Sequence, residues 1–300
     1  MNLKEKLKNW YVNFTQLRWT VGVADFDPRA ILDPKSKLKI HWVKHHCRES
    51  WFADPFILSE TDDYIYILVE EFIYSLNRGR ISRLKVNRHN WKLEGIDPII
   101  EQKTHMSFPA YYRENGKVYI YPENTLTGKL TLFEYDEETG AAVKVRDISD
   151  RPLADAVMYK INGNDVILAT TAPNDSGRNL DIYPYADGPQ KVPLDTVSFD
   201  SKIARNAGFP FEAQGLTIRP AQDCTRFYGS CVVLQEMAVE QGKLKFREIR
   251  RFYSPRFTYK HAFHTFNVFQ NKYVAVDAEG FRHGFVAWFF FTIRNIVRCR

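Results

Sequence analysis

A short strand-like pattern recurs along this chain of 300 residues. Each copy contains an aromatic or aliphatic residue, three mostly apolar residues and a final polar residue. The clear copies are Tyr66–Glu70, Tyr119–Glu123, Val166–Thr170 and Tyr273–Asp277. The last interval between copies is about twice the others, which indicates a missing copy near residue 220. We assign that copy to the degraded sequence Phe227–Cys231.

The sequence around each copy resembles a strand–turn–strand–loop–strand unit of about 50 residues. Hairpin turns are indicated between the first two strands by Asp62-Asp63, Asn115-Gly116 and Asn162-Gly163. A strand repeat of this length is typical of propeller blades. We therefore predict an all-β fold, a five-bladed β-propeller with short terminal helices, and a β-sandwich is the alternative. The segment Arg18–Phe26 is expected to close the ring by pairing with the last blade.

The two ends of the chain differ from the repeats, so we divide the chain into residues 1–17, 18–281 and 282–300. The first segment is predicted to form a basic amphipathic helix, and the last is aromatic and then basic. The apolar positions of the helix are Leu3, Leu7, Trp10, Tyr11 and Phe14. Two interpretations remain open: residues 1–16 and 285–300 make a peripheral contact with a membrane, or they cover apolar surface of the propeller.

Composition narrows the classes of protein that fit. The net charge is +6 without a run of Lys or Arg, so no nucleic-acid partner is predicted. No apolar run is long enough to span a bilayer, and no secretory signal opens the chain. The four cysteines form no CxxC pair, which favours reduced thiols. We expect a cytoplasmic location, peripheral on the inner face of the membrane.

Polar residues at the beginning of each blade's first strand are the candidate site residues, because ligands bind at one mouth of a propeller's channel. They are Asp54, Ser107, Asp155 and His264, together with Arg205, Arg219, Gln222 and Asp223 of the fourth blade. Two carboxylates are the minimum for glycosidic bond chemistry. Glu70 and Glu123, at the ends of second strands, are further candidates for an acid with a raised pKa.

Structural roles are the alternative for each of these residues. Asp54-Pro55 is also a plausible turn. Glu70, Glu123 and Asp277 are candidates for binding backbone amides between blades. Arg205, Arg219 and Asp223 are candidates for a buried ion pair, and His264 for a core histidine.

Common cofactor and catalytic motifs are missing from the sequence. There is no Walker loop, GxGxxG, GxSxG, HExxH or EF-hand loop, so the corresponding nucleotide, hydrolase and metalloprotease classes are disfavoured. His45 and His46 resemble metal ligands but lack a third partner at useful spacing. We predict no cofactor, and leave a requirement for a divalent metal undecided.

The ordered motifs of the chain resemble a known family. They are WFADPFI, HMSFPAYY, LADAVMY, RNAG, RPAQDCTRFYGSCVV and HTFN, from about Trp51 to Asp277. This set is similar to the N-terminal domain family of glucosamine inositolphosphorylceramide transferase, in its bacterial stand-alone form. The family in turn resembles the five-bladed propellers of arabinanase- and xylosidase-type glycosidases.

The resemblance implies roles for particular residues. The general base of those glycosidases corresponds to Asp54, and the aspartate that tunes the acid and orients the sugar corresponds to Asp155. Their general acid is a glutamate of the fourth blade, where this sequence has Arg205, Arg219, Gln222 and Asp223, with only Glu212 nearby. Ordinary hydrolysis is therefore in doubt, and the arginines better suit a phosphorylated or nucleotide-linked sugar.

These observations predict a carbohydrate-active enzyme of bacterial surface-polysaccharide or glycolipid assembly, a glycosyltransferase acting on a sugar or glycolipid substrate. Asp54 would act as base, Asp155 would position the sugar, Arg205 and Arg219 would neutralise phosphate, and His264 would bind or relay a proton. One alternative is a glycoside hydrolase with Glu123 or Glu212 as the acid. The other is a non-catalytic glycan-binding propeller.

Overall fold

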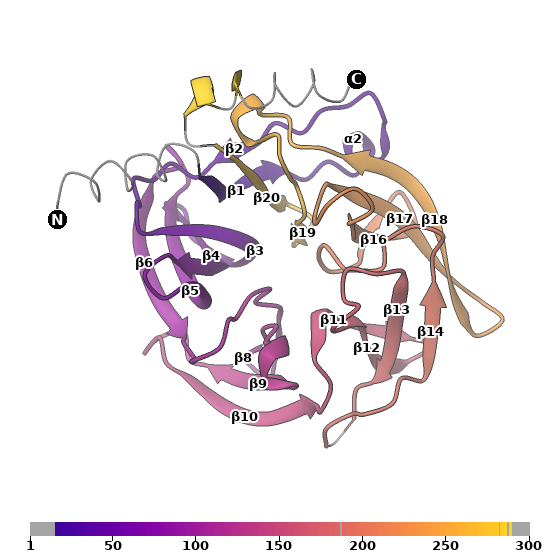
Figure 1. Ribbon diagram of the computed structural model, residues 1–300. Helices are drawn as coiled ribbons and strands as arrows, with labels where there is room; N and C mark the ends of the chain where they lie inside the picture. Colours follow the sequence, from indigo (N-terminus) through magenta and orange to yellow (C-terminus); the bar gives the residue numbers. More distant parts are fainter. Residues whose placement is uncertain (1–15, 187, 282, 287, 290–300) are drawn as a thin grey trace.

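The described strands form five antiparallel sheets around a central axis (Figure 1). The structure is a computed structural model that describes residues 16–186, 188–281, 283–286, 288 and 289. Within these residues every sheet has four strands, and each sheet is one blade. The predicted five-bladed propeller is confirmed. The described short helices are α2 (Pro28–Leu32), η1 (Thr125–Thr127) and η2 (Phe257–Tyr259).

Four blades are built from consecutive strands that run from the inside of the ring to the outside. Blade I contains β3 (Ser50–Glu60), β4 (Tyr64–Ile73), β5 (Arg78–Asn87) and β6 (Leu93–Ile100). Blade II contains β7 (Tyr111–Glu114), β8 (Lys117–Ile120), β9 (Leu130–Tyr135) and β10 (Ala142–Ser149). Blade III contains β11 (Leu153–Ile161), β12 (Asn164–Thr171), β13 (Asn179–Pro184) and β14 (Asp195–Ser198). Blade IV contains β15 (Phe211–Ala213), β16 (Leu216–Asp223), β17 (Cys231–Glu240) and β18 (Lys243–Phe252).

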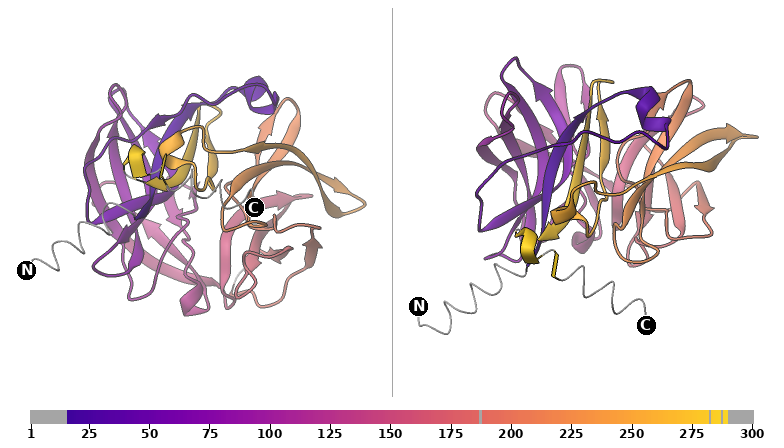
Figure 2. Two further views of the ribbon diagram at one scale, coloured as in Figure 1. Left: turned by 45° about the horizontal axis from the view of Figure 1, so that its top comes forward. Right: turned by 90° about the horizontal axis from the view of Figure 1, so that it is seen from above.

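Blade V joins the two ends of the ring. It contains β19 (Phe266–Phe269), β20 (Tyr273–Phe281), β1 (Leu17–Asp25) and β2 (His41–Trp42) in that order. Strand β1 pairs with β20 along its whole length, from Leu17 opposite Phe281 to Asp25 opposite Tyr273, and Figure 2 shows the two side by side. The predicted closing strand is therefore confirmed. Closure stabilises the fold because it leaves few unpaired strand edges.

Two of the predicted hairpin turns have the backbone conformation that such turns require. Asn115 and Gly116 have φ values of 49° and 78°, and Asn162 and Gly163 have 50° and 85°. Two consecutive positive φ angles match the right-handed twist of the flanking strands, and Asn-Gly adopts them at low cost. Both turns join the first and second strands of their blades, as the sequence predicts.

The assignment of the fourth copy of the repeat to Phe227–Cys231 is wrong. The second strand of blade IV is β16, and residues 227–230 lie in the connection from β16 to β17. The copy in register with the others is 218–222, which places Gln222 where other blades have Glu70, Glu123, Thr170 and Asp277. The copy is hard to recognise because it carries Arg219, a fully buried arginine, at an otherwise apolar position.

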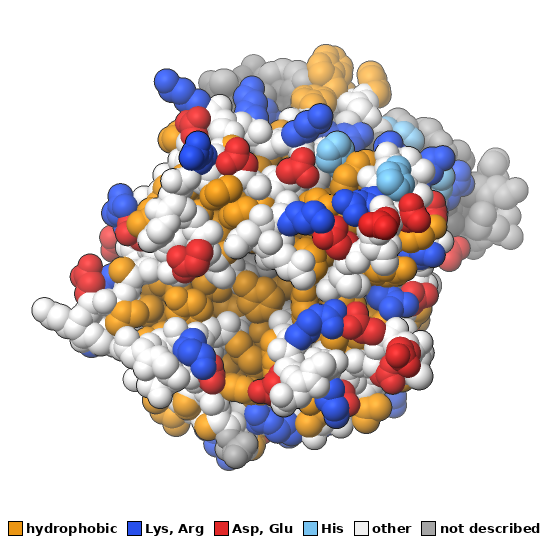
Figure 3. Space-filling model, turned by 180° about the vertical axis from the view of Figure 1, so that it is seen from behind, with side chains coloured by type: hydrophobic (Ala, Val, Ile, Leu, Met, Phe, Trp, Pro, Cys, Tyr) orange, Lys and Arg blue, Asp and Glu red, His pale blue; other side chains and the backbone are white. Residues whose placement is uncertain are grey.

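Apolar side chains fill the space between blades. Phe56 of blade I contacts Phe108 and Phe209 edge to face, with ring centroids 4.9 and 5.3 Å apart. Burying one such side chain contributes about 1.5–3 kcal/mol. Figure 3 shows the face turned away from the viewer of Figure 1, where hydrophobic side chains line a hollow near the centre and charged side chains surround it.

Candidate carbohydrate site

Bulges in two first strands direct aspartates to a common site. The pairing of β3 with β4 shifts between Ala53 and Phe56, and that of β11 with β12 shifts between Ala154 and Val157. Inside these bulges Asp54 and Asp155 have φ values of 50° and 45°. A bulge redirects a side chain, and a positive φ outside glycine costs about 1–3 kcal/mol. Such strain persists where the surrounding contacts hold it.

Asp54 is held by three blades. Its Oδ2 accepts the amide N–H of Phe108 at 3.0 Å, and its Oδ1 accepts the hydroxyl of Thr265 at 3.2 Å. Its own amide donates to Oδ2 of Asp277 at 2.9 Å. Only 3% of Asp54 is exposed. The carboxylate therefore has a fixed orientation at the junction of blades I, II and V.

A row of three side chains runs from Asp277 through His264 to Asp54, with a hydrogen bond between Asp277 and His264 and a longer charge contact between His264 and Asp54. The Nδ1 atom of His264 lies 2.8 Å from Oδ1 of Asp277, and its Nε2 lies 3.7 Å from Oδ1 of Asp54. The ring of Trp19 stacks on the imidazole with centroids 3.9 Å apart. Asp277 also accepts the amides of His264 and Thr265. These contacts fix the imidazole with one nitrogen toward each carboxylate.

Within this row of side chains, the pKa values of the two aspartates shift in opposite directions. Burial raises the pKa of Asp54, and the nearby charge of His264 only partly offsets it. Burial also opposes charge on Asp277, but the charge and hydrogen bonds of His264 lower the pKa of Asp277. Burial would lower the pKa of His264, yet the carboxylates of Asp277 and Asp54 raise it. His264 thus lies between a carboxylate whose pKa is lowered and one whose pKa is raised.

Among the described residues, these three side chains also form a group of potential metal ligands. One ligand atom from each of Asp54, His264 and Asp277 lies within 4.8 Å of the others. The same atoms already take part in hydrogen bonds, and Nδ1 of His264 contacts Asp277. A cation here would have to replace that network.

Arg205 binds the carboxylates on the other side of the site. Its Nε donates to Asp155 at 2.5 Å, its Nη2 donates to Glu123 at 2.9 Å, and its Nη1 pairs with Asp175. The ring of Tyr228 lies against the guanidinium at 5.3 Å. All three nitrogens therefore have carboxylate partners. Burial opposes the charge of Arg205, but Asp155 and Glu123 raise its pKa well above the usual range.

Asp155 has the most partners in the site. It accepts Nε2 of Gln222 at 2.6 Å as well as Arg205, and its amide donates to Oε2 of Glu123 at 3.0 Å. Asn206 binds its backbone carbonyl at 2.7 Å. Burial raises the pKa of Asp155 well above the ordinary value, although the charge of Arg205 opposes this. This network fixes the orientation of the Asp155 carboxylate.

Glu70 lies close enough to the other carboxylates for their charges to affect its pKa. Burial raises its pKa well above the ordinary value, and the carboxylates of Asp54, Glu123, Asp277 and Asp155 add to the effect. Its Oε1 lies 3.3 Å from Nε2 of His105, whose own pKa burial lowers. Both shifts favour a neutral pair. The acids of blades I, II, III and V therefore occupy one region of low dielectric constant.

We expect Glu70→Gln to stabilise the protein at neutral and alkaline pH. A raised carboxyl pKa stabilises the folded state below the ordinary carboxyl pKa, and this contribution is lost as pH rises through the folded-state pKa. The uncharged glutamine avoids that loss, so the gain should grow with pH. The free energy of unfolding from urea titrations at pH 4, 6 and 8 measures it. Equal or lower stability of the variant at pH 8 would show that buried Glu70 is not destabilising.

Most of the predicted site residues lie in or beside this cluster. They are Asp54, Glu70, Glu123, Asp155, Arg205, Gln222 and His264, and Ser107 pairs through its backbone with Glu123. Glu123 and Asp277 also bind amides of the following blade, as the structural alternative predicts. Glu212 is an exposed residue of β15 that accepts the hydroxyl of Thr217.

Arg219 and Asp223 do not join the cluster. Arg219 is fully buried between the rings of Phe199 and Phe246, and donates to Asn206 at 2.9 Å and Gln235 at 2.6 Å. Burial lowers the pKa of Arg219 to about 9. Asp223 pairs with Arg251 of β18, two strands away in the same blade. The alternative of an ion pair among Arg205, Arg219 and Asp223 is therefore wrong, because Arg205 pairs with carboxylates of other blades and Asp223 pairs with Arg251.

Several residues of the site were not among the sequence candidates. The sequence patterns indicate Asp277 only as the end of a repeat and as a candidate for binding backbone amides, and they do not single out Thr265, Asp175, Tyr228 or Trp19. The repeat already places Asp277 in register with Glu123, and the corrected fourth copy adds Gln222 to the same position. Asp175 lies in the connection between β12 and β13, where no pattern marks it.

The fold and the site define a class of protein: a five-bladed propeller whose strand ends bring acidic side chains and one buried guanidinium together at the axis. The chain belongs to the family described as "Glucosamine inositolphosphorylceramide transferase 1, N-terminal", whose model matches residues 41–276. The curated relatives include "Glucosamine inositolphosphorylceramide transferase 1" of Oryza sativa subsp. japonica, 24% identical over 200 residues, which are 63% of this chain and 26% of that protein.

A second relative of the same name, from Arabidopsis thaliana, is 24% identical over 213 residues, which are 67% of this chain and 27% of that protein. The chain thus spans about a quarter of the length of these relatives.

Solved structures with the same fold include glycosidases. An α-L-arabinofuranosidase from Lactobacillus brevis has a TM-score of 0.50 at 13% identity, over 72% of this chain and 78% of that one. A GH43 β-xylosidase/α-arabinofuranosidase from a compost metagenome, in complex with xylotriose, has a TM-score of 0.52 at 12% identity, over 77% and 91%. At these identities the likeness shows the propeller fold alone.

Proposed function

We propose that the chain is a carbohydrate-active enzyme, a glycosyltransferase in which Asp54 removes the proton from an acceptor hydroxyl. The observation that carries this proposal is the contact of His264 with Asp277 on one side and with Asp54 on the other. A general base works best when its pKa lies near the working pH, and burial raises the pKa of Asp54 in that direction. The imidazolium of His264 would stabilise the carboxylate before the proton arrives.

Arg205 favours transfer over hydrolysis. Hydrolysis of a glycosidic bond needs a carboxylic acid that protonates the leaving oxygen, opposite a base or nucleophile. The fourth-blade side chains that contact Asp155 are Arg205 and the amides of Gln222 and Asn206, and Arg205 remains protonated with carboxylates on all three nitrogens. A phosphate leaving group needs no such acid. Asp155 and Glu123 are then left to bind sugar hydroxyls.

Glycoside hydrolysis is the second candidate, and Glu70 is the observation that favours it. Its pKa is raised well above the ordinary value, as expected of a general acid. In that case Asp54 would act on water while Glu70 protonates the leaving oxygen. Release of reducing ends from an oligosaccharide without an activated donor would select this function.

We place the transferase in surface-polysaccharide or glycolipid assembly. The curated relatives are named for an amino sugar, a phosphorylated ceramide lipid and transfer. A bacterial setting, a cytoplasmic location and a glycolipid acceptor are parts of the same proposal. The chain spans about a quarter of the length of those relatives, so we propose for it only the transfer of the sugar and not their whole activity.

The direct test supplies the full chain with nucleotide-linked sugars and with glycolipid or oligosaccharide acceptors, and detects products by mass spectrometry. A product that has gained one sugar, formed only when the donor is present, supports the transferase. Sugar binding without any product would overturn the enzymatic proposal and favour a glycan-binding propeller.

Peripheral contact with a membrane belongs to this proposal, and exposed aromatic residues support it. Phe285, Trp288 and Phe289 are 69%, 54% and 46% exposed, whereas Val286 packs with Phe281 and Leu17. Aromatic rings of this kind prefer the membrane interface. Within the described residues, no helix has the length and apolar character needed to cross a bilayer. The predicted contacts of residues 1–15 and 290–300 lie outside the described residues.

The triple variant F285S/W288S/F289S should bind anionic vesicles several-fold more weakly than the parent protein, because it loses apolar surface that would enter the interface. Co-sedimentation with phosphatidylglycerol vesicles measures this. The control L126S/V192S/L194S removes apolar side chains that are 73%, 73% and 66% exposed. Equal losses in both variants, or no loss in the first, would contradict the membrane contact.

A further inference from the structure

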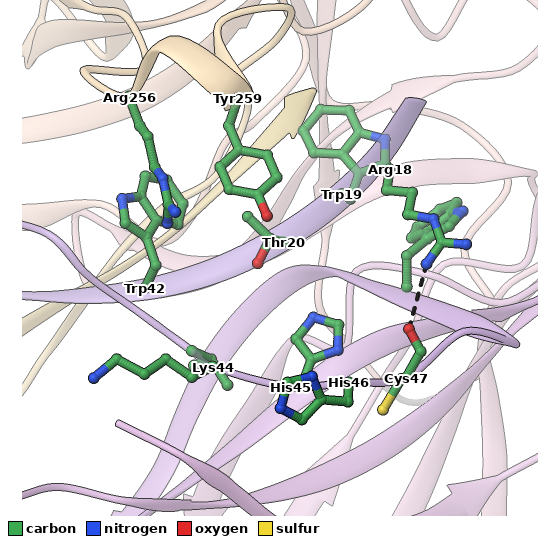
Figure 4. A pocket seen from close by; sticks show the side chains of 12 residues that line it. Arg18, Trp19, Thr20, Trp42, Lys44, His45, His46, Cys47, Arg256 and Tyr259 are labelled. Atoms are coloured by element: carbon green, nitrogen blue, oxygen red, sulfur yellow. Dashed lines mark hydrogen bonds between the residues drawn. The ribbon is translucent and has the colours of Figure 1, made fainter. Parts of the chain in front are cut away.

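A pocket lies at the seam between blades V and I, and its lining differs in charge from the acidic cluster. Its volume is about 270 Å³. Its lining residues are Arg18, Trp19, Thr20, Trp42, Val43, Lys44, His45, His46, Cys47, Trp51, Arg256 and Tyr259. None of these is acidic, while three are permanently cationic and two are histidines. Figure 4 shows the side chains of this pocket.

Arg256 and the two histidines lie on opposite walls of the pocket. Arg256 and Tyr259 belong to the connection that includes η2, and His45 and His46 follow β2 on the other side (Figure 4). The guanidinium of Arg256 lies 5.0 Å from the ring centroid of Tyr259. Arg18 fixes the histidine wall, because its nitrogens donate to the carbonyls of Cys47 and Arg48 at 3.3 Å. The amine of Lys44 turns away and donates to Asn90.

Trp19 separates this pocket from the acidic site. Its indole lines the pocket and also stacks on His264, the neighbour of Asp54, with ring centroids 3.9 Å apart. One aromatic side chain therefore stands between the basic pocket and the proposed base. A ligand that reaches around Trp19 would meet positive charge on one side and carboxylates on the other.

The acidic site itself has no guanidinium left for an anion. Arg205 has a carboxylate on each nitrogen, and Arg219 is enclosed by aromatic rings and backbone carbonyls. A phosphorylated ligand at the axis would therefore face a surplus of negative charge. The basic pocket offers what the axis lacks: an arginine fork for phosphate oxygens, with hydroxyl groups of Thr20 and Tyr259 and aromatic walls beside it.

We propose that the pocket between β1, β2 and η2 binds the phosphoryl group of an anionic ligand, through Arg256 and His46. The source of phosphate that best matches the position of Trp19 is a sugar phosphate or nucleotide-linked sugar. Its role as the donor site rests on the transferase function proposed above, whereas the binding of phosphate does not. A lipid headgroup would present the same phosphoryl chemistry, and the test distinguishes the two sources.

The test is isothermal titration of the full chain with pyrophosphate, uridine diphosphate and glucose 1-phosphate, with glucose as the uncharged comparison. We expect H46Q/R256Q to weaken binding of the phosphorylated probes at least tenfold and to leave that of glucose unchanged. Both replaced residues are exposed, so the fold should persist. The matched control R247Q/H89Q removes the same residue types where their side chains are 72% and 66% exposed, and should bind as the parent protein does.

Vesicles provide the second arm of the experiment. Binding to phosphatidylglycerol but not phosphatidylcholine vesicles, lost in H46Q/R256Q while soluble phosphates do not bind, would assign the phosphoryl group to a lipid. No phosphate-dependent binding of any probe, or equal affinities of H46Q/R256Q and the parent protein, would overturn the proposal. If the pocket binds phosphate but the protein transfers no sugar, the transferase proposal is contradicted and the phosphate-binding proposal is supported.

Discussion

Asp54→Asn should lower kcat for sugar transfer by about 10²- to 10⁴-fold, the usual contribution of a general base. Asparagine tolerates the positive φ of 50° at this position better than most residues, so the bulge should persist. Its carbonyl oxygen can still accept the amide of Phe108. The variant removes the proton acceptor and keeps the shape of the site. Steady-state kinetics at pH 7, with thermal unfolding as a check on folding, measure the effect.

Asp97→Asn is the matched control for this prediction. Asp97 lies on β6 at the outer edge of the same blade, and its side chain is 52% exposed and paired with Arg83. Neutralising it should change kcat less than twofold. Unchanged turnover in Asp54→Asn would remove Asp54 from the mechanism. A folded variant that still binds sugar but does not turn it over would support the proposed role.

Arg205→Met should lower the free energy of unfolding by about 3–5 kcal/mol, because it leaves Asp155, Glu123 and Asp175 without their shared cation. Methionine keeps much of the length of the side chain, so the loss reports mainly on charge. Urea denaturation measures it. Arg247→Met is the control: this arginine pairs with Glu236 on the surface, and its loss should cost less than about 1 kcal/mol.

The pH dependence of Arg205→Met separates charge from packing. Arg205 holds down the pKa of Asp155, which burial otherwise raises. Without the arginine that pKa rises further, so the folded state is favoured below the ordinary carboxyl pKa and loses stability as pH increases. The deficit of the variant should therefore be smaller at pH 4 than at pH 8. A deficit that does not change with pH would mean that lost packing dominates.

Local sequence was sufficient for the features that depend on a few neighbouring residues. Asn115-Gly116 and Asn162-Gly163 predict their hairpins because Asn and Gly tolerate the positive φ angles that such turns require. The pairing of β1 with β20 also follows from sequence, because a ring of blades needs a partner for the last one. The family resemblance agrees with the family model that matches residues 41–276.

The fourth blade shows where local pattern fails. Arg219 interrupts the apolar run of β16, so the repeat seemed to lie at Phe227–Cys231, in the connection that follows. The arginine is tolerated because Phe199, Phe246, Gln235 and Asn206 surround it. Those partners lie on strands and connections that only the folded chain brings together.

Arg219, Gln222 and Asp223 lie on β16, the second strand of blade IV, and not on a first strand as predicted. By itself the sequence determined the number of blades, the strand that closes the ring, and the position of Asp54 and Asp155 on first strands. Regular spacing and turn chemistry are enough for this, since each blade repeats the same local pairing. Only the tertiary structure decided that Arg205 binds three carboxylates while Arg219 stays in the core, and that Asp277 orients His264 toward Asp54. Bulges and packing between blades set the direction of each side chain, and residues far apart along the chain determine both.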